Sequence, residues 1–193
     1  MKEIHVKKLI TDEKMKKYQN TFIHPNQIKM IIDEDTDVYT TDGRLLLRFR
    51  KNTLTKEKIS KFYNAAGKYT LTNPTHNRGS TTGSKKKNVN DNPSVYSSIL
   101  GYFDRWAPNH KHTFKKLGIR TPVEVRETAF SLLHPDKFKA TFPLLREIDS
   151  YYRELVPTQY KKQRRKANET QFKIPGTSFT TITTNANFQT SIH

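Results

Sequence analysis

The sequence predicts an α+β fold, because segments with strand character and segments with helix character occupy separate stretches of one chain of 193 residues. Three observations support this class. An Asp-Gly pair lies between two apolar runs near the N-terminus, two stretches carry apolar side chains at helical spacing, and a Thr-rich stretch near the C-terminal end alternates as a strand does. The length suits one domain, or one domain with a basic extension.

The first predicted element is β-structure around a hairpin within the first 52 residues. The apolar run 28–32 and the pair Val38-Tyr39 precede Asp42-Gly43, and the run 45–49 follows it. The Asp-Gly pair supplies the positive φ that a tight hairpin turn requires. We therefore expect two strands that meet at this turn.

A helix is predicted next. Thr55 can cap its N-terminus, and Gly67 can end it in a left-handed conformation. Residues 70–93 are polar, rich in Gly, Pro and Asn, and without apolar periodicity, which predicts a loop. The predicted buried face of the helix comprises Ile59, Phe62, Tyr63 and Ala66.

The region after residue 120 allows two interpretations before a clear helix begins. Residues 121–124 (Thr-Pro-Val-Glu) have the form of a capping box, whereas the spacing of Val125, Thr128 and Phe130 fits a strand equally well. The next helix is predicted with Pro143 near its start and with its end at Val156-Pro157. Its apolar stripe comprises Leu144, Leu145, Ile148, Tyr151, Tyr152 and Leu155.

The last third of the chain combines a basic run with strand composition. Residues 161–166 (Lys-Lys-Gln-Arg-Arg-Lys) hold five positive charges in six residues, and we interpret 161–171 as a basic linker. Residues 172–193 are rich in Thr, Phe and Ile, and Phe179, Thr181 and Thr183 alternate with their neighbours. This alternation predicts a strand.

Composition favours a polyanionic partner and excludes several kinds of site. There are 35 Lys and Arg against 18 Asp and Glu, a formal net charge of +17, which favours nucleic acid first and an anionic membrane surface second. No stretch approaches the ~20 apolar residues of a membrane helix, and the charged N-terminus lacks the apolar core of a secretory signal. We therefore expect an intracellular protein. The absence of cysteine excludes disulfides, zinc-thiolate clusters and a thiol nucleophile.

Three motifs could carry chemistry, and each has a plainer interpretation. Residues 79–85 suggest a phosphate-binding loop, but their glycine spacing and the lack of a preceding strand do not fit one. His110 and His112 could chelate a metal, although an ordinary surface pair is favoured. His134-Pro-Asp136 with the distant His193 has the spacing of an iron site of two histidines and one carboxylate, but Asp136 could instead open the following helix.

Several separated segments, taken in order, form a more specific pattern. Each is short, but the last one extends over twenty residues and leads to His193. The segments are Asn77-Arg78-Gly79 with Gly83, the block Ser98–Asp104, Arg126-x-Thr128-x-Phe130, Leu155-x-Pro157-x-x-Tyr160-x-x-Gln163, and the stretch from Ile174-Pro-Gly-Thr through Asn185 to His193.

This pattern resembles the TET/JBP family of Fe(II)- and 2-oxoglutarate-dependent dioxygenases, from about residue 38 onward. The resemblance implies the N-terminal part of a double-stranded β-helix (jelly-roll or cupin-like) with flanking helices, with residues 1–37 as a separate N-terminal segment and 38–193 as the dioxygenase part. It also implies that His193 is an iron ligand. The family's next ligand, an Asp, would fall two residues later, so we expect the β-helix to be incomplete in this chain and the chain to be truncated at its first iron ligand.

The resemblance also implies roles for other residues. Asn77 and Arg78 match a position that binds 2-oxoglutarate, and a guanidinium suits a carboxylate because of its fixed charge and planar fork. The implied reaction oxidises the 5-methyl group of thymine or 5-methylcytosine in DNA, with the base flipped out of the duplex. RNA is the less favoured partner. Candidate DNA contacts are Arg126, Lys161, Lys162, Arg164, Arg165, Lys85, Lys86 and Lys87.

Two alternative functions stay open. The chain could be a basic nucleic-acid-binding module without catalysis, or a basic scaffolding protein. Steep salt dependence of nucleic-acid affinity would support the binding role. On the enzyme hypothesis the protein would act where DNA is, in the nucleus if the source is eukaryotic. On that hypothesis, thymine and 5-methylcytosine are the two alternative substrates.

Overall fold

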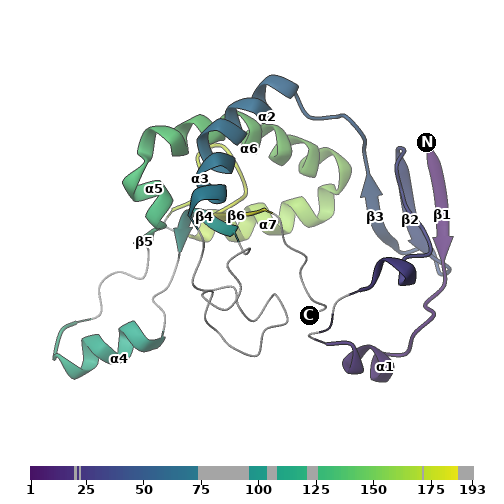
Figure 1. Ribbon diagram of the computed structural model, residues 1–193, viewed down its shortest axis with the longest axis horizontal. Helices are drawn as coiled ribbons and strands as arrows, with labels where there is room; N and C mark the ends of the chain where they lie inside the picture. Colours follow the sequence, from purple (N-terminus) through teal and green to yellow (C-terminus); the bar gives the residue numbers. More distant parts are fainter. Residues whose placement is uncertain are drawn as a thin grey trace. The chain divides into compact units, whose positions relative to one another are not determined.

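The computed structural model describes residues 1–19, 21, 23–73, 96–103, 108–120, 126–170 and 172–186 (Figure 1). The chain divides into two compact units. The first is described over residues 1–53 and the second over 54–73 and 96–186, apart from the gaps just given. The predicted boundary between residues 37 and 38 lies inside a strand of the first unit. The overall class is mixed, with small sheets and several helices, as expected for α+β.

The described strands of the first unit form a sheet in the order β1-β2-β3. β2 and β3 are the predicted hairpin, which is confirmed: they pair antiparallel, and Gly43 has a φ of 81° in the turn. β1 pairs in parallel with the other edge of β2. The described part of this unit also contains two short helices. The bounds are β1 Lys2–Val6, α1 Asp12–Lys17, the 3₁₀ helix η1 Pro25–Gln27, β2 Thr36–Thr40 and β3 Leu45–Phe49.

The apolar run 28–32 is not a strand, so this part of the prediction is wrong. The edge of β2 that the run could have paired with is occupied by β1. Ile31 is consequently exposed, and Ile28 and Met30 are about half exposed. The strand that replaces the run begins at Lys2, where two charged residues precede the alternation of Ile4 and Val6.

Asp37 on β2 is a buried charged residue of the first unit, with 1% of its surface exposed. Arg50 Nη2 lies 2.7 Å from its Oδ1, and Arg48 Nε lies 3.1 Å from its Oδ2. Burial alone would raise the pKa of Asp37, but the hydrogen bond and charge of Arg50, together with Arg48 and the Tyr39 hydroxyl, hold that pKa below its ordinary value. Asp37 on β2 therefore forms ion pairs with two arginines, one on β3 and one directly after it.

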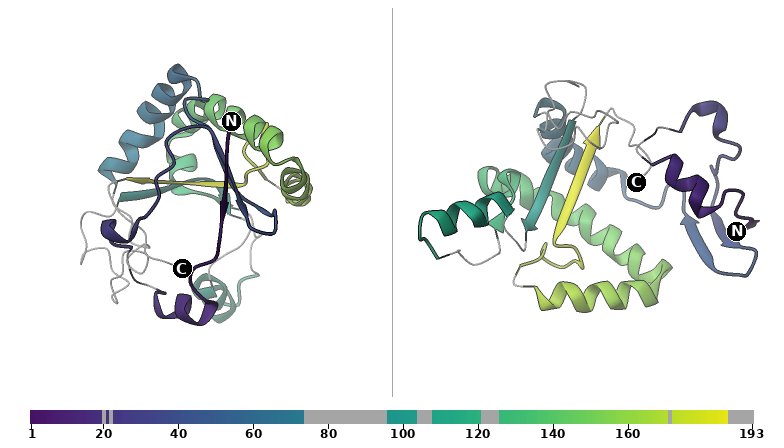
Figure 2. Two further views of the ribbon diagram at one scale, coloured as in Figure 1. Left: turned by 90° about the vertical axis from the view of Figure 1, so that its right-hand side faces the viewer. Right: turned by 90° about the horizontal axis from the view of Figure 1, so that it is seen from below.

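The second unit combines three described strands with helices that pack against them. β4 lies in the middle and pairs antiparallel with β5 on one side and β6 on the other, and Figure 2 shows β4 and β6 side by side. The strands are β4 Tyr96–Phe103, β5 Arg126–Glu127 and β6 Thr181–Ala186. The helices are α2 Lys56–Phe62, the π-helix η2 Tyr63–Gly67, α3 Lys68–Thr72, α4 Pro108–Lys116, α5 Ala129–Leu133, α6 Pro135–Leu155 and α7 Pro157–Glu169.

The hydrophobic core of this unit joins its helices to β4. Full burial of one Leu, Ile or Phe side chain contributes about 1.5–3 kcal/mol, so this cluster is the main source of cohesion. Phe62, Tyr69 and Ile148 pack around it. The buried members are Ala66, Leu100, Phe130, Phe138, Leu145 and Ile174.

The helix that begins after Thr55 continues past its predicted end. Gly67 has a right-handed φ of −64°, and the helical stretch reaches Thr72. The role of Gly67 is to leave room for the Tyr63 ring, because a Cβ at position 67 would lie 2.6 Å from Cδ2 of Tyr63. The Thr55 side chain makes no cap hydrogen bond; its hydroxyl donates to Glu147 Oε1 on α6 at 2.7 Å.

Two further boundaries differ from prediction. α6 begins at Pro135, so Pro143 is inside the helix on its exposed side, and Asp136 lies in the first turn. The basic run 161–166 is helical, as part of α7, where we expected a linker. Ala167 and half-buried Tyr160 anchor this helix against the unit. An amphipathic pattern with so few apolar residues is easily missed in a charged run.

The region that allowed two interpretations contains both a strand and a helix. Residues 121–125 are outside the described residues, Arg126 and Glu127 pair with β4, and Thr128 then caps α5 by accepting from Ser131 N. No helix in the described stretches is long and apolar enough to cross a membrane.

Candidate functional site

The described parts of the segments singled out by sequence lie in the second unit. β4 carries most of the 98–104 block, and β6 carries residues 181–186 of the C-terminal stretch. The two strands pair from Tyr96 opposite Ala186 to Gly101 opposite Thr181. Ser97 Oγ donates to Asn185 Oδ1 at 2.7 Å, and Thr70 and Thr184 hydroxyls share a 2.6 Å hydrogen bond. Two segments far apart in the sequence are thus joined by backbone pairing and by hydrogen bonds between polar side chains.

Gly101 is the point where three of these segments touch. Its N–H donates to Ser131 Oγ at 2.8 Å, and its carbonyl accepts from Thr128 N at 2.9 Å. Gly101 has a φ of 98°, and a Cβ there would lie 2.3 Å from the Thr180 carbonyl oxygen. No other residue fits this conformation and this approach. The glycine of the 98–104 block is therefore required by packing.

Residues 174–179, called here the Pro-Gly turn, connect α7 to β6 and are held by side chains from two helices. Arg146 Nε on α6 donates to the Pro175 carbonyl at 3.0 Å. From α7, Arg164 Nη1 donates to the Thr177 carbonyl, and Gln163 Nε2 donates to the Ser178 carbonyl at 3.3 Å. A Cβ at Gly176, which has a φ of 81°, would lie 2.7 Å from Arg146 Nε.

Asp149 on α6 supplies the carboxylate that completes this arrangement. It is 5% exposed, and its Oδ1 accepts from both N and Oγ of Ser178, each at 2.6 Å. Its Oδ2 accepts from the Tyr160 hydroxyl on α7 at 3.2 Å. One carboxylate therefore ties α6, α7 and the Pro-Gly turn together. Burial, with the nearby charge of Asp149, raises the pKa of Tyr160 and keeps its hydroxyl protonated as a donor.

The basic residues proposed from sequence fall into two groups. Lys161, Lys162 and Arg165 are exposed on α7. Arg164 is half buried and donates a hydrogen bond to the Pro-Gly turn; its role as a DNA contact stays a prediction. Arg126 opens β5, opposite Phe103 of β4, and is half buried.

The remaining predicted site residues lie outside the described residues. These include the proposed iron ligand, the proposed 2-oxoglutarate contacts and one lysine run. They are His193, Asn77, Arg78, Lys85, Lys86 and Lys87. The phosphate-loop-like stretch 79–85 lies outside as well.

The described residues contain no group of three or more His, Asp or Glu side chains that could hold a metal ion. His134 is packed among aromatic rings: its centroid lies 5.1 Å from Tyr69 and 5.9 Å from Phe130. Asp136 opens α6, as the plainer interpretation of this motif predicted. His112 is exposed on α4, a helix.

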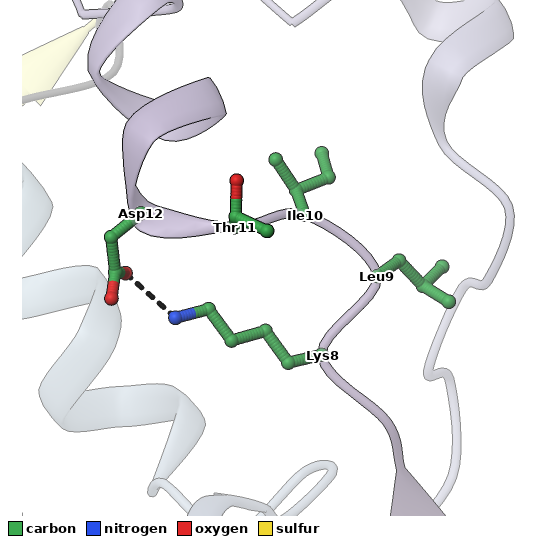
Figure 3. Close-up of a pocket in the computed structure, with 5 residues that line it drawn as sticks. All are labelled: Lys8, Leu9, Ile10, Thr11 and Asp12. Carbon is green, nitrogen blue, oxygen red and sulfur yellow. Dashed lines mark hydrogen bonds and ion pairs between the residues drawn. The ribbon is translucent and has the colours of Figure 1, made fainter.

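Two shallow hollows occur in the described parts of the chain. The first, about 290 Å³, lies between α7 and the residues around the start of β6, with Gln163, Lys166 and Thr181 in its lining. The second, about 330 Å³, is lined by the consecutive residues 8–12 of the first unit. Figure 3 shows that Lys8 and Asp12 pair across it while Leu9 and Ile10 point away, as in a simple bend of the chain.

Sequence reasoning missed Asp149, Ser178 and Arg146. Asp149 had a detectable signal, because it lies four residues after Leu145 and three before Tyr152, on the apolar stripe of a helix. A carboxylate at such a position is either exposed by a break in the stripe or bound by buried donors. Nothing local indicates which donors bind it.

Comparison with known proteins agrees with the pattern of motifs. The bifunctional helicase and thymine dioxygenase JBP2 of Leishmania braziliensis is 34% identical over 97 residues, which are 50% of this chain and 8% of that protein. The thymine dioxygenases JBP1 of Leishmania braziliensis and Crithidia fasciculata are 32% and 33% identical over 102 and 101 residues, 52% of this chain and 11% of each of those proteins. No protein-family model and no solved structure matches. The resemblance to the TET/JBP family is confirmed.

Proposed function

We propose that this protein is a dioxygenase that oxidises the methyl group of thymine in DNA. The observation that carries the proposal is the similarity of half the chain to proteins named thymine dioxygenases. 5-Methylcytosine, which carries a methyl group at the same ring position, is the alternative substrate. Because the matched stretch spans only 8–11% of those relatives, their activity comes to this chain as a proposal. An enzyme of this kind would act inside the cell, in the nucleus of a eukaryote.

The proposed cofactors are Fe(II) and 2-oxoglutarate, which together would supply the oxidising power for the methyl group. His193 is the proposed iron ligand, and Asn77 and Arg78 are the proposed contacts to 2-oxoglutarate; all three lie outside the described residues. The described residues alone form no such metal site.

The contribution of the described residues is the framework that leads to His193. The Pro-Gly turn is fixed by Asp149, Gln163 and Arg164, and β6 starts two residues after the end of the turn, at Thr181. β6 is in turn bonded along its length to β4 and ends at Ala186, seven residues before His193. In the proposal, β5, β4 and β6 belong to one sheet of a double-stranded β-helix, and the turn sets the register of the strand that precedes the ligand.

DNA as the partner is supported by the net charge of +17 and by the exposed cations of α7. A thymine methyl group inside a duplex can be oxidised in an enclosed pocket only if the base is flipped out, at a cost of a few kcal/mol that phosphate contacts and stacking can offset. Half-buried Arg126, at the edge of the sheet, is the proposed side chain that faces the flipped base.

The test uses the full natural polypeptide that contains this sequence, with Fe(II), 2-oxoglutarate and a thymine-containing DNA duplex. We expect 5-hydroxymethyluracil in the digested DNA and an equal amount of succinate, both measured by mass spectrometry. A parallel duplex with 5-methylcytosine distinguishes the two substrates. Failure to form either oxidised base, with a folded and metal-loaded protein, would contradict the proposal.

A matched pair of variants tests the ligand assignment. His193→Ala should abolish both products, whereas His112→Ala, which removes an exposed histidine, should leave them unchanged. Iron content is measured for both proteins. Full activity and full iron content in His193→Ala would show that His193 is not a ligand.

The second candidate function is nucleic-acid binding without catalysis, which the exposed cations of α7 also favour. The same experiment separates the two. A protein that binds the duplex with strong salt dependence but leaves every base unmodified would support the binding role alone.

A further inference from the structure

We propose that the outer face of α7 is a docking surface for the phosphate backbone of double-stranded DNA, with Lys161, Lys162 and Arg165 as the direct contacts. The choice of DNA over other polyanions rests on the proposed function. The surface itself is inferred from the two faces of α7, one of which carries exposed cations while the other contacts the rest of the unit.

The three residues share one side of the helix. Lys161 and Arg165 are four residues apart and therefore lie one above the other, about 6 Å apart along the helix axis. Lys162 lies about 100° around the same axis, on the neighbouring strip. All three are exposed. Within the described residues, none of them forms an ion pair with a carboxylate, so their charges are available to a partner.

The opposite face of α7 is occupied by structural contacts. Tyr160 binds Asp149, Gln163 binds the Ser178 carbonyl, Arg164 binds the Thr177 carbonyl, and Ala167 is buried. These contacts fix the rotation of the helix about its axis. The three exposed cations are consequently presented by a rigid element, which reduces the ordering that binding requires.

The acidic residue of α7 is Glu169 at its C-terminal end, whose pKa is lowered by its hydrogen bond to Lys166 and also by the charges of Lys166 and Arg165. Residues 157–168 contain no Asp or Glu, and Glu169 pairs with Lys166 at 2.7 Å. Lys166 is for that reason excluded from the surface. A single-sign patch of this kind matches the regular negative charge of a DNA backbone, where binding is favoured by release of condensed counterions.

The experiment measures the salt dependence of binding by the full chain to a short fluorescein-labelled DNA duplex. The main variant carries Lys161→Gln, Lys162→Gln and Arg165→Gln. Each phosphate contact contributes about 0.9 to the slope of log affinity against log salt, so the variant's slope should be smaller by about 2.7. Between about 50 and 200 mM salt, the wild-type affinity should therefore fall by about 40-fold more than the variant's.

Two control variants make the result specific. Lys56→Gln, Lys68→Gln and Lys139→Gln remove the same charge from exposed positions on α2, α3 and α6, and should leave the slope near the wild-type value. Arg164→Gln removes a cation from the same run but from the inner face. It should lower the melting temperature and leave the slope unchanged.

Several outcomes would overturn the proposal. Equal slopes for the two triple variants would show that only total charge matters. Tighter binding to phosphatidylserine vesicles, or to a duplex RNA of the same length, would assign the surface to a different partner. A reduced slope in the α7 variant supports the surface even if the thymine oxidation assay gives no product, so the two proposals fail separately.

Discussion

Among the described residues, each unit buries one aspartate, and the two are stabilised by different chemistry. In the first unit, Asp37 lies against the guanidinium groups of Arg48 and Arg50. In the second, Asp149 accepts hydrogen bonds from Ser178 N–H, Ser178 Oγ and the Tyr160 hydroxyl. The negative charge of Asp37 is thus balanced by two arginine cations, whereas that of Asp149 is stabilised by uncharged hydrogen-bond donors.

The difference shows what each carboxylate does for the fold. An ion pair to long, partly exposed side chains tolerates small movements and is weakened by salt; the Arg48 side chain is 30% exposed. A carboxylate bound by a backbone N–H and two hydroxyls fixes those atoms in one geometry. The first arrangement is suited to holding a hairpin closed, and the second to holding the Pro-Gly turn in place.

The largest effect should come from Asp149→Ala. The substitution removes three hydrogen bonds to a charged acceptor and leaves the Ser178 donors buried without a partner, so the free energy of unfolding should fall by about 3 kcal/mol. Denaturant unfolding measures the loss. Hydrogen exchange should locate it in α6, α7 and the Pro-Gly turn, with β1–β3 unaffected.

The controls for this variant lie at the same position and at the next one. Asp149→Asn keeps one acceptor oxygen and should lose less stability than Asp149→Ala. Ser150→Ala, at an exposed position, should change little. Equal losses for the alanine and asparagine variants would show that the charge, and not the hydrogen-bond geometry, is what matters, and the contrast with Asp37 would disappear.

Asp37→Asn should have the next largest effect, about 2 kcal/mol, because the partly exposed arginines can recover some hydration when the charge is removed. Hydrogen exchange should increase in β2 and β3. Asp33→Asn removes the same charge from an exposed position and serves as the control. Unchanged exchange in the hairpin of Asp37→Asn would show that the ion pairs do not hold it.

Acid should reproduce part of this loss without any substitution. The pKa of Asp37 is lowered in the folded state, so its contribution to stability is fully present above the ordinary carboxyl pKa and is lost as the pH falls through the lowered value. Because amide exchange is itself slower in acid, the quantity to compare is the protection factor of the hairpin amides, which should fall at acidic pH in the wild type and less so in Asp37→Asn. An identical pH response in both proteins would assign the acid sensitivity to other groups.

The smallest effect is expected from Tyr160→Phe, about 1 kcal/mol, because one neutral donor to Asp149 is lost while the ring remains. The pKa of Tyr160 is raised by burial and by Asp149, so its contribution is present below the ordinary tyrosine pKa and is lost as the pH rises through the raised value. Unfolding curves of the wild type should therefore lose stability more steeply than those of the variant at alkaline pH. Tyr18→Phe, at an exposed phenol, is the control.

Elements that depend on interactions between residues close in the sequence could be predicted from the sequence alone. The hairpin followed from Asp42-Gly43, and the middle of α6 followed from the apolar stripe that includes Leu144 and Leu145. The start of α6 was missed because Pro143 has the character of a first-turn residue, yet proline is tolerated inside this helix on its exposed side. The basic run 161–166 gives little signal of a helix, because the buried face of α7 contains few apolar residues, such as Tyr160 and Ala167, among many charged ones.

The candidate site was predictable only as far as its motifs. The pattern Ile174-Pro-Gly-Thr marked the right segment, and Gly101 lay within a marked block. The partners of these residues could not be predicted, because Asp149, Arg146 and Gln163 reach the Pro-Gly turn from helices that are remote from it in the sequence. The parallel pairing of β1 with β2 was missed for the same reason.

That parallel strand has a consequence for the order of folding. The β2–β3 hairpin closes through the few residues between Thr40 and Leu45, whereas β1 must bring Lys2 beside Thr36 across a much longer loop. Closing the longer loop costs more conformational entropy, so pairing of β1 becomes favourable only after the β2–β3 hairpin has formed. We therefore expect the hairpin to form on the microsecond timescale of isolated hairpins and β1 to dock afterwards. Refolding kinetics of the first unit should then show β1 as the last strand to gain exchange protection.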